Sequence, residues 1–242
     1  MTMQYLANPT RFLRLANALL PYLWALTAGL LVIGLYGALV SSPPDYQQGE
    51  TVRIMYVHVP AAWMALFVYS VMALASAVAL IFRHPLADVA AKTAAPLGAA
   101  FCFLALATGS LWGKPMWGAW WVWDARLASM FVLMLLYLGY MAIWAAIEEP
   151  HRAAMVARIV ALVGFINVPI VKFSVDWWNS LHQPASVFRM DGPTIAAPML
   201  WPLLVMGLAY TFLFLSLHLV AMRAEIAARK IRQIQIAEIG ER

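Results

Sequence analysis

Tryptophans are concentrated in one short stretch near the middle of the chain. Residues 112–126 hold five of the eleven tryptophans, Trp112, Trp117, Trp120, Trp121 and Trp123. Tryptophan favours the membrane–water interface, which explains about one or two such residues at a helix end. Five on one connecting segment indicate instead an aromatic shelf on which a flat apolar ligand stacks.

Two histidines flank this stretch and could bind a metal. His58 comes just before an apolar run that starts at Ala61, and His182 comes just after one that ends at Val175. Neutral imidazole is a favoured iron ligand and can coordinate haem from either face. A single histidine at the membrane interface is more often a structural residue than a ligand. The interpretation of the pair as iron ligands therefore depends on both histidines lying on the same side of the membrane. Zinc is less favoured, because these segments have no cysteine and no third histidine.

Two arginines could meet an anionic ligand. Arg126 follows Asp124 by two residues, so it either pairs with that carboxylate or forms bidentate hydrogen bonds with a ligand. Arg53 lies five residues before His58 and could equally be a solvated charge. Haem is a flat apolar macrocycle with iron at its centre and two propionate carboxylates on one edge. Tryptophan faces, imidazoles and guanidinium groups together match it.

The composition is that of an integral membrane protein. Hydrophobic residues make up 64% of the 242 positions, charged residues only 11%, and the mean hydropathy is +0.78. The net charge of +5 forms no single patch, which argues against nucleic-acid binding. One cysteine, with no C-x-x-C-H motif, excludes covalent c-type haem on this chain, and the P-loop signature is absent.

The elements that must position these residues are membrane-spanning helices. A helix needs about 20 apolar residues to cross the hydrocarbon core. Asn167 and Pro169 predict a kink in the fifth such run. We therefore expect an all-α bundle of six transmembrane helices in one domain, residues 1–222. The spans cover residues 19–40, 61–82, 93–111, 127–147, 159–175 and 197–222.

The distribution of basic residues predicts the orientation. The termini and the segments 83–92 and 148–158 hold 11 of the 16 Lys and Arg residues, so this side is expected to be cytoplasmic. The loops 41–60, 112–126 and 176–196, with both candidate histidines, then face the periplasm. The tail 223–242 has isoleucines between charges and predicts a cytoplasmic amphipathic helix on the membrane or on a partner.

The tryptophan stretch also carries a family resemblance. Residues 117–127, Trp-Gly-Ala-Trp-Trp-Val-Trp-Asp-Ala-Arg-Leu, resemble the signature of the haem-handling proteins of cytochrome c maturation. The whole chain is similar to the six-span CcmC family, as are the stretches 45–49, 58–62, 108–115 and 177–183. Ala128 departs from the Thr or Ser usual there. The related CcmF and CcsA have more spans or paired intramembrane histidines.

The resemblance implies a transfer protein rather than an enzyme. CcmC proteins present non-covalently bound haem b at the periplasmic face of the bacterial inner membrane to the haem chaperone CcmE. They work with the ABC transporter subunits CcmA and CcmB and with the small membrane protein CcmD. The resemblance implies His58 and His182 as axial ligands and the five tryptophans with Asp124 as the haem shelf, which we also expect to dock CcmE. We expect Arg53 and Arg126 to contact the propionates.

Two other interpretations remain open at this stage. A quinone-linked redox protein would use haem for electron transfer, and it predicts a second histidine pair across the membrane. The spans supply only His218, which is more typical of packing or hydrogen bonding, while His84 and His151 fit solvated inner loops. A structural transporter subunit without a ligand would leave the histidines and tryptophans unexplained.

Overall fold

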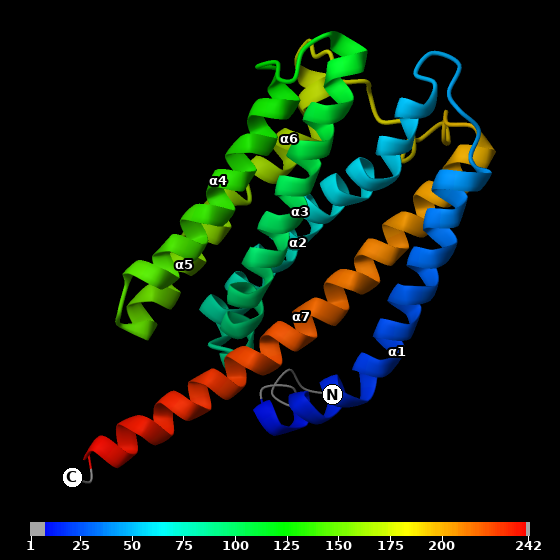
Figure 1. Ribbon diagram of the computed structural model, residues 1–242. Helices are drawn as coiled ribbons and strands as arrows, with labels where there is room; N and C mark the ends of the chain where they lie inside the picture. The colour runs from blue at the N-terminus through cyan, green and yellow to red at the C-terminus, as the bar shows by residue number, and fades with distance from the viewer. Residues whose placement is uncertain (1–7, 241–242) are drawn as a thin grey trace.

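The structure, a computed structural model, describes residues 8–240, and every regular element in that range is helical. The described residues form seven α-helices, and Figure 1 shows how these helices are arranged in a bundle. Two short turns accompany them, a π-helical turn at Gly37–Ser41 and a 3-10 turn at Glu50–Ile54. The helices are α1 (Pro9–Tyr36), α2 (Met55–Phe82), α3 (Pro85–Trp117), α4 (Ala125–Ala146), α5 (Pro150–Gly164), α6 (Asn167–Trp177) and α7 (Ala197–Gly240).

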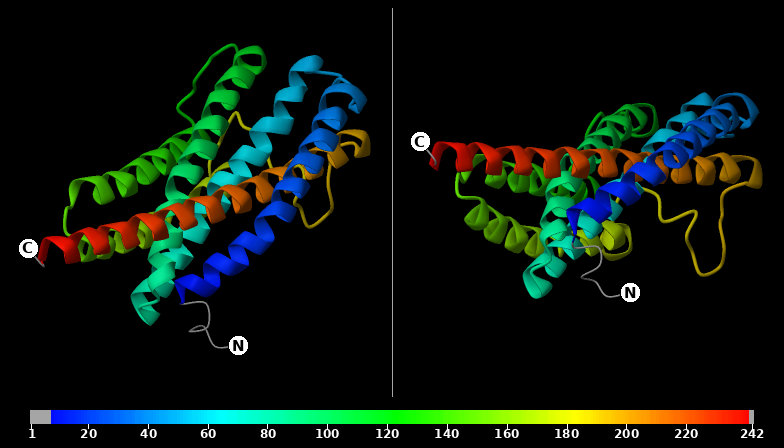
Figure 2. Two further views of the ribbon diagram at one scale, coloured as in Figure 1. Left: turned by 60° about the horizontal axis from the view of Figure 1, so that its bottom comes forward. Right: turned by 90° about the horizontal axis from the view of Figure 1, so that it is seen from below.

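Six helical segments in the described range are long and apolar enough to cross a membrane, which confirms the expected all-α six-span fold. Helices α5 and α6 together make the fifth of them. Helix α1 packs along α7, α2 packs along α3, and α4 contacts α3, α5 and α6. Figures 1 and 2 show α1 and α7 as a pair beside the other helices.

The fifth span is interrupted where the sequence predicts a kink. Helix α5 ends at Gly164, and α6 begins at Asn167 after a two-residue turn. The buried Asn167 side chain donates a hydrogen bond to the Ser129 carbonyl oxygen of α4 at 2.9 Å. A neighbouring helix thus supplies a partner for the polar group at the break, as an apolar environment requires.

Two helix ends on the side of the cavity differ from the expectation. Helix α3 continues to Trp117 and ends where Gly118 adopts a positive φ of 75°, so the non-helical outer segment is only 118–124. Helix α2 already begins at Met55, directly after the 3-10 turn, so His58 lies on a helix and not in a loop. The tail, by contrast, is helical as expected: through Gly240 it continues α7 without a break, because no proline or glycine lies between Gly207 and that residue.

Ion pairs join the helices at the end of the bundle opposite segment 118–124. Asp88, near the start of α3, accepts from Arg158 of α5 at 2.8 Å. Lys92 of α3 donates to Glu225 of α7, also at 2.8 Å, and Arg229 shares that carboxylate. His218 contacts the Ala90 carbonyl oxygen through Nε2 at 2.9 Å, in agreement with the hydrogen-bonding role expected for it.

A glycine permits the close packing of α3 on α4. A Cβ added at Gly98 would collide with the Tyr137 ring, and the Tyr137 hydroxyl donates to the Ala65 carbonyl oxygen at 2.7 Å. We expect Gly98→Ala to destabilise the protein by roughly 1–3 kcal/mol, because the tyrosine must move within a packed core. Thermal unfolding in detergent measures the effect. Gly139→Ala on α4, where nothing lies within 4 Å, is the matched control and should not lower the melting temperature.

Candidate functional site

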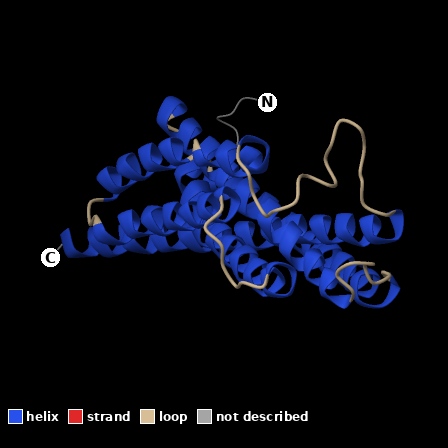
Figure 3. Ribbon diagram, turned by 90° about the horizontal axis from the view of Figure 1, so that it is seen from above, coloured by secondary structure: helices blue, strands red, loops and turns tan. Residues whose placement is uncertain are grey.

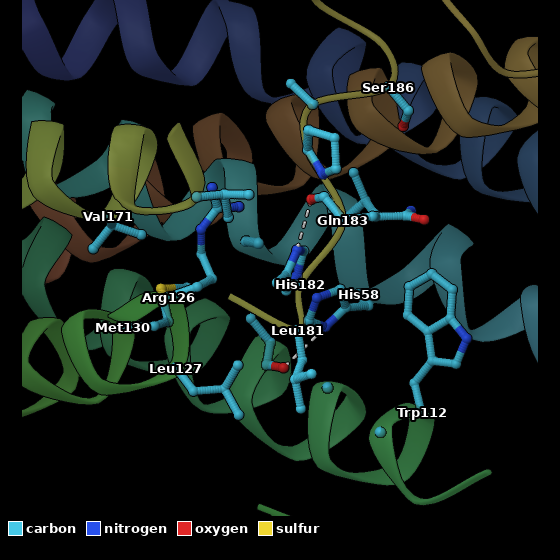
Figure 4. A pocket seen from close by; sticks show the side chains of 18 of the residues that line it. His58, Trp112, Arg126, Leu127, Met130, Val171, Leu181, His182, Gln183 and Ser186 are labelled. Carbon is cyan, nitrogen blue, oxygen red and sulfur yellow. Dashed lines mark hydrogen bonds between the residues drawn. The ribbon is translucent and has the colours of Figure 1, made fainter. Parts of the chain in front are cut away.

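A cavity lies at the end of the bundle where α3 ends and α4 begins. Its volume is about 390 Å³, within the roughly 300–1,000 Å³ usual for small-molecule sites. Side chains from α2, α3, α4 and α6 line it, and the irregular segment 178–196 closes one side. Figure 3 views the molecule from above, with the connecting segments in tan, and Figure 4 shows the cavity from close by.

The cavity brings the two candidate histidines together. The ring centroids of His58 and His182 are 6.5 Å apart, with an angle of 33° between the ring planes. Nδ1 of His58 is 3.0 Å from the Ala105 carbonyl oxygen, and Nδ1 of His182 is 3.1 Å from that of Gln183. A carbonyl can only accept, so each Nδ1 carries the proton and each Nε2 keeps its lone pair for a metal.

The spacing of the rings suits one iron atom between them. Metal–imidazole bonds are roughly 2 Å long, so an iron bound by both Nε2 atoms would hold the ring centroids about 6 Å apart. The observed 6.5 Å is close to that value. The two histidines come from parts of the chain more than 120 residues apart, and only the packing of segment 178–196 over α2 and α3 makes them neighbours.

His58 is held by α3. The hydroxyl of Thr108 donates to the Leu104 carbonyl oxygen at 2.6 Å and lies 3.2 Å from His58 Nδ1, so it can accept the imidazole proton. A Cβ at Gly109 would lie 2.9 Å from the ring, and Trp112 contacts the ring edge at 5.7 Å between centroids. Sequence reasoning missed Thr108 and Gly109 as supports, although both lie in a stretch similar to the family.

His182 has a different environment. It lies on segment 178–196, its main-chain N–H donates to the Ser180 hydroxyl at 3.0 Å, and its ring is 6.3 Å from that of Trp117. Burial lowers the pKa of His182, and the Arg126 charge adds to this effect, while the Gln183 carbonyl and the Asp124 carboxylate oppose it. The imidazole is therefore neutral at pH 7, which is the form that binds a metal.

Three of the five tryptophans line the cavity, namely Trp112, Trp117 and Trp121. The other two do not: Trp120 is 55% exposed beside Lys114, and Trp123 is 74% exposed. The five-residue shelf thus stays a prediction, of which this structure places three residues at the cavity. The physical reason is that segment 118–124 is irregular, so its side chains point in different directions. Trp121 Nε1 is buried and has no acceptor in the described part of the chain.

A turn before α2 adds two residues that sequence reasoning missed. Gln47 and Gln48 line the cavity, and Gln48 Oε1 accepts a hydrogen bond from Trp112 Nε1 at 2.9 Å. The turn is held by Asp45, whose side chain accepts from both glutamine N–H groups at 2.9 and 2.8 Å. Gly49 closes it with a positive φ of 57°. The sequence signal that could have identified these two glutamines is the family-like stretch Asp-Tyr-Gln-Gln-Gly at residues 45–49.

Asp124 and Arg126 are not paired with each other in this structure. Asp124 caps the start of α4 by accepting from the Leu127 N–H at 2.8 Å, and its second oxygen accepts from the Ser180 hydroxyl. Arg126 lines the cavity and donates to the Ser174 hydroxyl at 2.8 Å and to the Lys172 carbonyl oxygen at 3.3 Å. The charge of Arg126 thus borders the cavity without a carboxylate partner at ion-pair distance in the described residues.

Arg53 lies outside the cavity. Its guanidinium pairs with Glu50 and donates to the Ala38 carbonyl oxygen at 2.6 Å. The expectation that Arg53 reaches the same ligand as Arg126 is not supported by this arrangement, because its hydrogen bonds hold it against the end of the first span.

These features define a multi-pass membrane protein with a two-histidine, tryptophan-lined pocket at one end of its bundle. The family model described as CcmC, heme exporter protein C, matches residues 2–237. The chain belongs to this family.

Curated relatives match over nearly the whole chain. It is 60% identical to the heme exporter protein C of Bradyrhizobium diazoefficiens over 238 residues, covering 98% of this chain and 90% of the relative. It is 41% identical to that of Escherichia coli strain K12, covering 92% of this chain and 89% of the relative. A putative cytochrome c biosynthesis ccmC-like mitochondrial protein of Marchantia polymorpha is 46% identical over 83% of each chain.

Proposed function

We propose that this protein binds haem b non-covalently at the periplasmic face of the bacterial inner membrane and presents it to the haem chaperone CcmE. It acts as a transfer protein for cytochrome c maturation and not as an enzyme. The family name connects the chain with haem export. The observation that carries the finer proposal is the pair of imidazoles, 6.5 Å apart, inside a cavity walled by tryptophan.

The donor set fits haem better than a bare ion. In the described residues, no group of three or more His, Cys, Asp or Glu could hold a metal ion. Haem iron brings four nitrogen ligands of its own, so two histidines complete its coordination. The apolar wall suits the macrocycle, and the Arg126 guanidinium at the cavity can bind propionate oxygens. Since Arg53 lies outside the cavity, the proposal assigns the propionate contact to Arg126 alone.

The proposed orientation rests on charge. Eleven of the 16 Lys and Arg residues lie on the side of the termini, so we assign that side to the cytoplasm and the cavity to the periplasm. Helix α7 has 44 residues, and at about 1.5 Å per residue it is roughly twice as long as the hydrocarbon core is thick. Its charged C-terminal part therefore extends toward the cytoplasm, where it can contact the ABC transporter formed by CcmA and CcmB, with CcmD as a further membrane partner.

The five tryptophans have two different proposed functions, haem contact and CcmE docking. Trp112, Trp117 and Trp121 line the cavity and would contact haem. Trp120 and Trp123 are exposed beside the cavity, and Trp123 packs on Phe131 of α4. Exposed tryptophans at the centre of an interface are frequent binding hot spots. We therefore assign Trp120 and Trp123, together with the Asp124 region, to CcmE docking.

This division predicts opposite defects from similar substitutions. Trp121→Ala should lower haem retention and leave haem-independent association with CcmE near wild type. Trp120→Ala and Trp123→Ala should retain haem and weaken CcmE capture by about 30-fold or more, the effect of a hot-spot residue. Absorption spectra of the purified protein and co-purification of CcmE, with and without haem, separate the two properties. Loss of haem from Trp123→Ala to the same extent as from Trp121→Ala would contradict the division.

The proposed function as a whole is tested in cells that lack this chain. Haem-loaded CcmE should be absent from them and should return when the wild-type chain is supplied. The purified protein should show a b-type spectrum with two histidine ligands. A b-type spectrum together with normal haem loading of CcmE in the cells that lack the chain would instead support a redox protein.

A further inference from the structure

The two histidines are held in different ways. His58 is on α2, and its ring is fixed by the Ala105 carbonyl and the Thr108 hydroxyl of the adjacent α3. His182 is on a segment without helix or strand, and its ring Nδ1 contacts the carbonyl of the next residue, Gln183. A ligand on a helix that packs along another helix moves less readily than one on an irregular surface segment.

One relay of hydrogen bonds connects His182 to the helical bundle. The His182 N–H donates to the Ser180 hydroxyl at 3.0 Å, and that hydroxyl donates to Asp124 Oδ2. Asp124 Oδ1 in turn accepts from the Leu127 N–H and caps α4. In the described part of the chain, residues 179–183 form no other hydrogen bond to a helix or to its cap.

We propose that Ser180 and Asp124 form a latch that holds His182 in its ligand position, so that His182 is the exchangeable axial ligand and His58 the fixed one. The inference rests on the proposed haem-binding function and extends it. Asp124 is next to Trp123, so a partner that contacts the exposed tryptophans can also act on the latch. Opening the latch frees one face of the iron for an acceptor's ligand while His58 still holds the other.

The latch implies a sequence of steps in the transfer of haem to an acceptor, with release of His182 first. An acceptor shifts haem by its differential affinity for the opened and closed states, and a closed site offers no free iron position. With the latch open, the acceptor replaces one bond at a time, and haem is never without an iron ligand. Ser180 is a positioning residue in this scheme, because it does not line the cavity and acts through His182.

The test measures how readily an external ligand replaces His182. Full-length protein in lipid nanodiscs is loaded with ferric haem b, and imidazole is added as the probe. Ser180→Ala should keep its haem and its melting temperature but exchange with imidazole about tenfold faster, because one hydrogen bond to a carboxylate is lost. The high-spin fraction of its spectrum should rise toward that of His182→Ala, in which the ligand is absent.

Two variants separate the latch from a general loosening of the segment. Ser180→Thr keeps the hydroxyl and should exchange at the wild-type rate. Asn179→Ala, at the neighbouring exposed position, should also behave as wild type. Fast exchange in Asn179→Ala, or equally fast exchange in Ser180→Thr and Ser180→Ala, would overturn the latch.

The same measurements distinguish this inference from the function on which it rests. A wild-type protein without a low-spin haem spectrum would overturn both. A wild-type low-spin spectrum with Ser180→Ala exchanging at the wild-type rate would overturn the latch alone and leave haem binding by the two histidines intact.

Discussion

His58→Ala and His182→Ala are each expected to abolish the six-coordinate, low-spin haem spectrum of the wild-type protein. The rings lie 6.5 Å apart with both Nε2 atoms available, so each should supply one axial ligand. Removing an outer-shell partner of a metal ligand costs roughly 10–100-fold in affinity, and removing the ligand itself should cost more. Haem titration followed by absorption and electron paramagnetic resonance measures both quantities.

The two histidine variants should differ in how much haem they retain. His58→Ala should lose nearly all haem, because the remaining ligand is on an irregular segment, whereas His182→Ala should keep a five-coordinate haem that added imidazole restores to low spin. His218→Ala is the matched control, since that ring bonds the Ala90 carbonyl oxygen near the opposite end of the bundle. Wild-type low-spin spectra in both single variants would disprove the axial assignment.

Arg126→Gln is expected to weaken haem binding by about 10- to 150-fold, which corresponds to the roughly 1.5–3 kcal/mol of a hydrogen bond to a charged group. Arg126 lines the cavity, and its guanidinium donates to a hydroxyl and to a carbonyl oxygen, so further N–H groups remain for a propionate. Arg126→Lys keeps the positive charge but lacks the planar guanidinium, so its haem affinity should lie between those of the wild type and Arg126→Gln. Equilibrium titration with haem measures the affinities.

Esterified haem provides the decisive comparison. The dimethyl ester of haem has no propionate charges, so wild type and Arg126→Gln should bind it with similar affinity if Arg126 acts on a propionate. Arg53→Gln is the matched control, because Arg53 is held by Glu50 and the Ala38 carbonyl outside the cavity, and it should change haem affinity by less than about threefold. An equal loss of ester binding in Arg126→Gln would show that Arg126 only supports the packing of α4 on α6.

Much of the fold follows from local properties of the sequence. Apolar runs long enough to cross a bilayer predict the six spans, since backbone groups in lipid must be satisfied within a helix. Asn167 predicts the interruption of the fifth span, because a buried amide in an apolar run needs a partner from outside. Helix ends were less predictable. The apolar run of the third span was expected to end at residue 111, and yet α3 continues to Trp117.

The candidate site was predictable in residue type more than in geometry. Histidine, tryptophan and arginine on three outer connections indicate a planar ligand with iron and carboxylates, and the resemblance to the CcmC family adds its identity. Three of the five tryptophans and one of the two arginines line the cavity. The sequence could not select them, because an irregular segment has no repeating pattern that assigns its side chains to one face.

The sequence by itself therefore determined the class of the protein, its six spans and the kinds of side chain at its site, because composition and periodicity are local. Only the tertiary structure decided which side chains meet. Contacts between distant segments place Gln48 on Trp112, Thr108 on His58 and Ser180 on Asp124. These pairs form because the ends of α2, α3, α4 and α6 pack at one end of the bundle, where buried polar groups must find partners from whichever segment lies opposite.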